Sequence, residues 1–268
     1  MNLRPSEWIT IVYFTYLLCA ALAMYWIPRQ RRGVIIGASV AVGIAILTIS
    51  RFGARTVWLR DWIPLVYVLI GYRLPALFVT ATNQRFERTL LAWDHRWFGI
   101  RDATEVSKRA SGVVIEVLEL AYLFCYPMIP AGFACLYTSG LRDEADRFWI
   151  AVLLSVFACY GMLPWLPTRP PRTVAGEPAR SSVLIRRLNL RVLGVASIQL
   201  NTFPSGHAAA AAATALAVGA RLPLAGAVLG LLALGIAIGS VVGRYHYAAD
   251  ALAGGVIGIV GFLISQSC

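Results

Sequence analysis

Long apolar runs separated by short polar stretches dominate this chain of 268 residues. Each run comes near the ~20 apolar residues that a helix needs to cross a bilayer. Strands would leave backbone N–H and C=O groups unpaired in lipid, so the runs predict helices. The eight runs cover residues 8–27, 33–50, 62–80, 113–138, 148–166, 207–222, 224–242 and 247–265.

We therefore expect an all-α fold, a polytopic membrane helix bundle of about eight spans, with a range of six to eight. The run at 207–222 is short and rich in alanine, so it crosses the membrane only if its polar entrance lies below the bilayer surface. Residues 1–56 are expected to hold N-terminal membrane spans, and residues 57–268 a membrane core whose chemistry lies within 167–250. Near-helical spacing in the last run predicts close helix packing at three glycines, Gly254, Gly258 and Gly261.

Composition agrees with a membrane protein, because 59% of the residues are hydrophobic and only 14% are charged, against roughly a quarter charged in soluble domains. The net charge of +11 comes almost entirely from arginines that are scattered among short loops. No soluble basic domain gathers them, so nucleic acid is not expected as a partner. Anionic head groups of the bilayer and a phosphorylated substrate explain the excess better.

Two polar junctions carry the candidate chemistry. The first reads Phe-Pro-Ser-Gly-His over residues 203–207, and the second reads Arg-Tyr-His-Tyr-Ala-Ala-Asp over residues 244–250. They hold two of the three histidines, His207 and His246. An imidazole can exchange a proton or attack phosphorus near neutral pH. The sequence therefore predicts an enzyme site that acts on a phosphorylated substrate.

His246 and Asp250 are four residues apart, so on a helix they share one face and the carboxylate can accept a proton from one ring nitrogen. The other nitrogen can then attack phosphorus, and a phosphohistidine divides one displacement into two easier ones. We expect His207 to protonate the departing alkoxide and afterwards to activate water or an acceptor hydroxyl. The scheme needs no cofactor and no metal, and the sequence shows no cluster of metal ligands.

The phosphate itself is expected to meet backbone and guanidinium groups. Ser205, Gly206 and the N–H groups that open the alanine-rich helix predict an anion seat, because the helix dipole also favours negative charge there. Planar guanidinium cations bind phosphate oxygens in pairs. Arg169, Arg172 and Arg244 are the candidates to neutralise the charge on the equatorial oxygens.

These segments resemble the type 2 phosphatidic acid phosphatase superfamily, whose three motifs are K-x6-R-P, P-S-G-H and S-R-x5-H-x3-D. The second motif is intact at residues 204–207, the third keeps His246 and Asp250, and the first keeps Arg169-Pro170. Including the spacing between motifs, the resemblance covers roughly residues 60–265.

The resemblance implies a six-helix phosphatase-like core within residues 57–268, with the N-terminal spans added to it. It also implies a lipid phosphate as substrate and a metal-independent phosphatase or phosphotransferase that works through a phosphohistidine. Met162 stands where the family lysine would fall, and Ser240 where the family arginine would fall. Arg172 or Arg244 would have to supply the missing cation.

Alternatives to simple hydrolysis stay open at this point. The segments Pro-Thr-Arg-Pro-Pro-Arg at 167–172 and Trp-Asp-His-Arg-Trp-Phe-Gly at 93–99 look more like the branch that contains inositol phosphorylceramide synthase. That likeness implies a head-group transferase. A membrane transporter is a more distant alternative, which predicts an inverted internal repeat that the sequence does not show.

Three further polar residues have simpler interpretations. His95 lies in a stretch typical of an interfacial helix and is expected on the surface. Glu116 and Glu119 lie inside an apolar run, where a carboxylate is costly, so we expect them to face the bundle interior. There they would bind a head group or pair with Arg73.

Eight spans would place all three motif loops on the same side of the membrane. That side carries more Lys and Arg residues than the other, and by the positive-inside rule it would face the cytoplasm. Members of the superfamily usually work on the extracytoplasmic leaflet, so the resemblance implies a plasma-membrane enzyme with an extracytoplasmic site. No oligomeric state is predicted.

Overall fold

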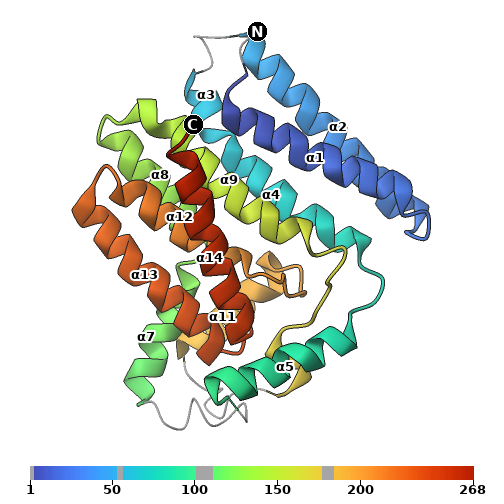
Figure 1. Cartoon of the computed structure of the whole chain (residues 1–268), viewed down its shortest axis with the longest axis vertical. Coiled ribbons are helices and arrows are strands. Elements are labelled where there is room, and N and C mark those ends of the chain that lie inside the picture. Colours follow the sequence, from blue (N-terminus) through green and yellow to red (C-terminus); the bar gives the residue numbers. More distant parts are fainter. Residues whose placement is uncertain (1–2, 53–56, 101–110, 177–183) are drawn as a thin grey trace.

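The helices of this protein follow its apolar runs. The computed structural model describes residues 3–52, 57–100, 111–176 and 184–268, and there the secondary structure is helical apart from one antiparallel bridge between Thr168 and Asn201. The expected all-α fold is confirmed. The elements are α1 (Pro5–Ala23), α2 (Arg29–Arg51), α3 (Val57–Trp62), α4 (Pro64–Arg73), η2 (Leu74–Phe78), α5 (Gln84–Phe98), α7 (Gly112–Leu123), α8 (Met128–Thr138), η3 (Arg142–Glu144), α9 (Ala145–Gly161), α10 (Pro171–Val174), α11 (Leu184–Ala196), α12 (Gly206–Gly219), α13 (Pro223–Val242) and α14 (Ala248–Ser265), arranged as Figure 1 shows.

Five segments in the described part of the chain are long and apolar enough to cross a membrane: α1, α2, the segment Val57–Phe78, α13 and α14. α7 and α8 are bent by 67° against each other and would count as a sixth span together. The run at 113–138 is therefore broken, at a turn that ends in Pro127, which has no N–H to continue a helix. α9 and α12 have 17 and 14 residues, so two of the eight expected spans are shorter than a full crossing.

α9 is the central helix of the molecule. It packs against α1, α4, α12 and α14, and its Trp149 and Leu153 are fully buried. From α1, the ring of Tyr13 stacks on Phe157 of α9 with 4.0 Å between centroids. The N-terminal helix therefore shares its core with the rest of the molecule. The predicted domain boundary between residues 56 and 57 lies at the edge of residues 53–56, which are outside the described residues, and it stays a prediction.

Glycines let α14 approach its neighbours closely, as their spacing predicted. A Cβ at Gly254 would meet the backbone of Ser205, and one at Gly258 would meet the carbonyl of Ala209. A Cβ at Gly261 would meet α9. The N-terminal half of α14 is thereby held against the start of α12, and the two polar junctions come together.

α5 lies across the end of the bundle at which α14 begins (Figure 1). Its buried Asp94 accepts hydrogen bonds from the N–H groups of Ala248 and Ala249, at 3.0 and 3.3 Å. A carboxylate from α5 thus satisfies N–H groups that the first turn of α14 cannot pair within itself. His95 on the same helix is exposed, as predicted.

The carboxylates of α7 are paired, but not with Arg73. Glu116 accepts hydrogen bonds from the two N–H groups that open α11, at 3.1 and 3.2 Å. Glu119 forms a buried ion pair with Arg186 of α11, while Arg73 donates to the carbonyl of Val195. The expectation that these carboxylates have structural partners was right, but the expected partner Arg73 was wrong. α11 supplies the partners, because it packs directly on α7.

Candidate active site

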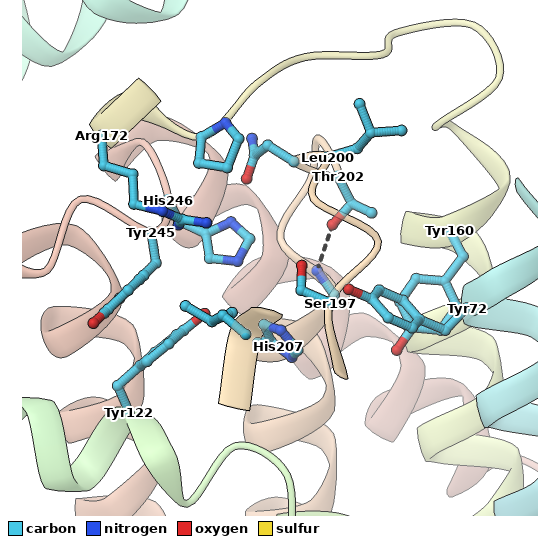
Figure 2. A pocket seen from close by; sticks show the side chains of 14 residues that line it. Tyr72, Tyr122, Tyr160, Arg172, Ser197, Leu200, Thr202, His207, Tyr245 and His246 are labelled. Carbon is cyan, nitrogen blue, oxygen red and sulfur yellow. Dashed lines mark hydrogen bonds between the residues drawn. The ribbon is translucent and has the colours of Figure 1, made fainter. Parts of the chain in front are cut away.

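The polar junctions of the chain meet at one small cavity, shown in Figure 2. The loops at 167–172, 203–207 and 244–250 all contribute to it, so the three motif loops lie on the same side of the bundle. Its volume is about 20 Å³, which is room for about one water molecule. Both candidate histidines, four tyrosines and one arginine line it: His207, His246, Tyr72, Tyr122, Tyr160, Tyr245 and Arg172.

The two histidine rings face this cavity from different elements. His207 belongs to the first turn of α12, and His246 lies in the turn before α14. Their ring centroids are 5.6 Å apart and the ring planes are nearly perpendicular. At that separation both imidazoles can contact one phosphoryl group, with one as nucleophile and the other as proton donor.

Asp250 lies behind His246. Its Oδ1 is 3.3 Å from Nδ1 of His246, and the carboxyl group is completely buried. The pair meets although His246 precedes α14 by two residues, because Asp250 is in the first turn of that helix. Oδ2 of Asp250 accepts a hydrogen bond of 2.6 Å from the side-chain amide of Asn201. With Nδ1 next to the carboxylate, Nε2 of His246 is the nitrogen that a ligand can meet.

Asn201 is a residue that the motifs did not indicate. Its N–H donates to the carbonyl of Thr168 at 2.8 Å, and its side chain lies 3.3 Å from Oγ1 of Thr168. This short bridge ties the loop after α9 to the loop before α12. It places an amide donor on the carboxylate that orients His246.

The start of α12 differs from the predicted anion seat. The Oγ atom of Ser205 accepts from the N–H of Ala208 at 3.3 Å, and the N–H of Gly206 donates to Oγ1 of Thr202 at 3.2 Å. These N–H groups therefore already serve the helix cap. Gly206 lines the cavity, whereas the fully buried Ser205 does not. The role that remains for Ser205 is to fix the turn that presents His207.

Of the three arginines predicted to bind phosphate, Arg172 is the one that lines the cavity. Its residue is 8% exposed, and its Cζ atom lies 5.4 Å from the ring centroid of Tyr245, a cation–π contact. Its backbone N–H donates to the carbonyl of Arg244 at 3.1 Å. Backbone and side chain together hold the guanidinium group beside the histidines.

Arg169 points elsewhere. Its Nε and Nη2 atoms bind the two carboxylate oxygens of Glu87 at 3.1 and 2.8 Å, and its side chain is 42% exposed. Burial alone would raise the pKa of Glu87, but the hydrogen bonds and charge of Arg169 outweigh it and hold that pKa below its ordinary value. Arg169 does not line the cavity, because a carboxylate 82 positions earlier in the chain engages its guanidinium group.

Arg244 does not line the cavity either. It is buried with a positive φ of 61°, and its carbonyl accepts the Arg172 N–H described above. The two altered family positions add no cation. Met162 is 38% exposed and lines an apolar groove between α1 and α9. The carbonyl of Ser240 accepts the N–H groups of Tyr245 and His246, at 2.8 and 3.0 Å, and so shapes the turn that carries the histidine.

The geometry of the site agrees with a comparison against known families. The profile of the PAP2 superfamily matches residues 88–264, which is more than half of the chain. The chain belongs to the PAP2 superfamily. No curated protein and no solved structure matches it. Membership of the PAP2 superfamily supports a phosphatase-type function, and the apolar helices place the protein in a membrane.

Proposed function

We propose that this PAP2 protein is a membrane enzyme that transfers the phosphoryl group of a lipid phosphate through a phosphohistidine at His246. The observation that carries the proposal is the cavity in which His246, His207 and Arg172 meet, with the buried Asp250 behind His246. A nucleophile, a carboxylate that fixes its tautomer, a proton donor and a cation are the parts that such a transfer needs.

The proposed reaction has two balanced steps. In the first, Nε2 of His246 attacks phosphorus, the P–O bond to the alcohol breaks, and His207 gives its proton to the leaving oxygen. In the second, His207 takes a proton from water or an alcohol, that oxygen attacks phosphorus, and the P–N bond breaks. Arg172 neutralises charge on the phosphoryl oxygens in both steps.

Head-group transfer is the second candidate. Here an alcohol takes the place of water, as in the inositol phosphorylceramide synthase branch that two segments of the chain resemble. One of those segments, 167–172, holds Arg172, which lines the cavity, so the likeness extends to the site itself.

Assays of the purified protein in detergent test the proposal. A lipid phosphate should release inorganic phosphate, or a phospholipid with an esterified head group should pass its phosphorylated head group to an acceptor lipid. Chelators should leave the rate unchanged. His246→Ala should abolish turnover, while the exposed His95→Ala should retain it and serves as the matched control. Activity that a chelator removes and a divalent metal restores would contradict the metal-free scheme.

We also propose that the site faces the extracytoplasmic leaflet of the plasma membrane. α5 lies at the same end of the molecule as the site, and His95 on it is exposed. In a background whose five native cysteines are replaced by serine, a His95→Cys variant should therefore react with a membrane-impermeant thiol reagent added to intact cells. Reaction that occurs only after the cells are opened would place the site on the cytoplasmic side.

A further inference from the structure

A buried ion pair that the proposed chemistry does not use lies behind the cavity wall. Oε1 of Glu119 on α7 is 2.8 Å from Nη1 of Arg186 on α11. The side chains of Glu119 and Arg186 are 3% and 1% exposed. Removing two charges from water costs several kcal/mol per ion, so a buried pair contributes little to stability compared with apolar residues of similar size. A role in the site would explain its presence.

The second carboxylate oxygen of Glu119 reaches the cavity wall. It accepts hydrogen bonds from the side-chain amide of Asn189, at 2.7 Å, and from the hydroxyl group of Tyr245, at 2.6 Å. Burial and the nearby carboxylate raise the pKa of Tyr245 far above its usual range, so the phenol keeps its proton and donates it in this bond. Glu119 thereby fixes one end of a side chain that lines the cavity.

The face of Tyr245 is fixed as well. Its ring stacks on Tyr122 with 4.1 Å between centroids and an angle of 4°. The guanidinium carbons of Arg172 and Arg186 each lie 5.4 Å from its ring centroid. Figure 2 shows Arg172, Tyr245 and Tyr122 side by side along this wall of the cavity. A shift of Tyr245 would therefore move the surface on which Arg172 rests.

The same pair fastens the turn that carries the proposed nucleophile. Nη1 of Arg186 donates to the carbonyl of Gly243 at 3.0 Å, three residues before His246. The next carbonyl in the chain accepts the backbone N–H of Arg172. Arg186 binds this turn at its backbone, and Glu119 binds it at the hydroxyl group of Tyr245, so α7 and α11 together hold the turn.

We propose that Glu119 and Arg186 are positioning residues of the phosphoryl-transfer site, which set the places of Tyr245, Arg172 and His246. The inference rests on the proposed function. It predicts that loss of the pair lowers kcat strongly in a protein that still folds. The reason is that displacing reacting groups by about 1 Å can reduce a rate about 10²-fold.

The test compares two ion pairs of the same kind. Glu119→Gln breaks the pair beside the cavity. Glu7→Gln is the matched control, because Glu7 on α1 binds Arg60 of α3 at 2.6 Å with both side chains largely buried, and neither helix lines the cavity. For wild type, both variants and Tyr245→Phe, we would measure the melting temperature in detergent, kcat and KM on a lipid phosphate, and inhibition by vanadate.

We expect Glu119→Gln and Glu7→Gln to lower the melting temperature to a similar extent. Glu119→Gln should also lower kcat about 10²-fold and weaken vanadate inhibition, whereas Glu7→Gln should change neither. Tyr245→Phe keeps the ring and loses the bond to Glu119, so it should lower kcat with little loss of stability. Equal kcat values for folded Glu119→Gln and Glu7→Gln would overturn the inference.

A double variant separates positioning from packing. Glu119→Leu combined with Arg186→Leu removes both charges, so the melting temperature should recover relative to Glu119→Leu alone, while kcat stays low because the hydrogen bonds from the pair to Tyr245 and Gly243 are lost. Recovery of both quantities would show a purely structural pair and overturn the inference. A wild-type protein without any phosphate release or head-group transfer would instead overturn the proposed function.

Discussion

His207 and His246 differ in what surrounds them, and this difference assigns their proposed roles. His246 has the Asp250 carboxylate at Nδ1, which suits a nucleophile that must carry positive charge after it attacks. His207 has three tyrosine rings around it, with centroids 5.9 to 6.4 Å away, and no carboxylate partner is described for it. With no such partner among the described residues to hold its proton, His207 can pass a proton to the leaving oxygen in the first step and take one in the second.

His207→Ala should therefore reduce the reaction rate most for substrates whose leaving group must be protonated. A natural alkyl phosphate should react ~10²–10⁴-fold more slowly, while the formation of the enzyme intermediate from an activated aryl phosphate should change little, because a good leaving group departs without protonation. Pre-steady-state release of the aryl alcohol measures the first step alone. Equal losses on both substrates would argue against a general acid.

Arg172 and Arg169 should also differ in how much they contribute to vanadate binding. Arg172→Ala should weaken vanadate inhibition by an amount on the order of 2–5 kcal/mol, since it removes a buried charge from the cavity. Arg169→Ala should have a smaller effect on vanadate, because that side chain binds Glu87 and does not line the cavity. Vanadate dose–response curves at fixed substrate concentration test both variants. A larger loss of vanadate inhibition in Arg169→Ala than in Arg172→Ala would contradict the assignment.

At the scale of elements, the start of α14 depends on α5. Asp94 binds the N–H groups of Ala248 and Ala249 just ahead of Asp250, so the position of the Asp250 carboxylate follows from a helix crossing rather than from its own sequence. Burial raises the pKa of Asp94 to about 6, against the lowering effect of these two hydrogen bonds. The folded protein thus binds a proton at Asp94 more tightly than the unfolded chain does.

This shift gives a pH dependence with a definite sign. A carboxyl group whose pKa is raised on folding stabilises the fold below its unfolded pKa, and that contribution is lost as the pH rises to its folded value. Melting temperatures of wild type and Asp94→Asn, measured from pH 4 to pH 7, should therefore differ most in favour of wild type at pH 4. The advantage should shrink up to about pH 6 and then stay constant. If the melting temperature of wild type instead gained on that of Asp94→Asn as the pH rose from 4 to 6, the predicted sign would be wrong.

The helices could be predicted from the sequence wherever a local pattern of apolar residues or glycines determines them. The apolar runs gave helices at all eight places, and the spacing of Gly254, Gly258 and Gly261 correctly indicated close packing of α14. The short run at 207–222 also indicated that α12, with 14 residues, is shorter than a full span. Hydropathy did not show that α7 and α8 are bent apart, because the bend depends on how neighbouring helices pack, which apolar composition does not encode.

At the scale of the whole molecule, the motifs indicated residues that meet at the candidate site, but not all of their partners. His207, His246 and Arg172 meet in one cavity, as an enzyme site requires. Arg169 and Arg244 could not be separated from Arg172 in advance, because the carboxylate that engages Arg169 is 82 residues away in the chain. Asn201, Tyr245 and the pair formed by Glu119 and Arg186 carry no motif, and only the folded arrangement brings them to the site.

The central claim is that phosphoryl transfer passes through His246, and trapping the intermediate tests it most directly. The His207→Ala variant lacks the base of the second step, so an activated aryl phosphate with labelled phosphorus should load the enzyme and leave it loaded. After an alkaline quench, which preserves phosphohistidine, peptide mass spectrometry should find one phosphoryl group per chain on His246 and none in the His207→Ala, His246→Ala double variant. Label on another residue, or no label in a variant that still releases the aryl alcohol, would contradict the account.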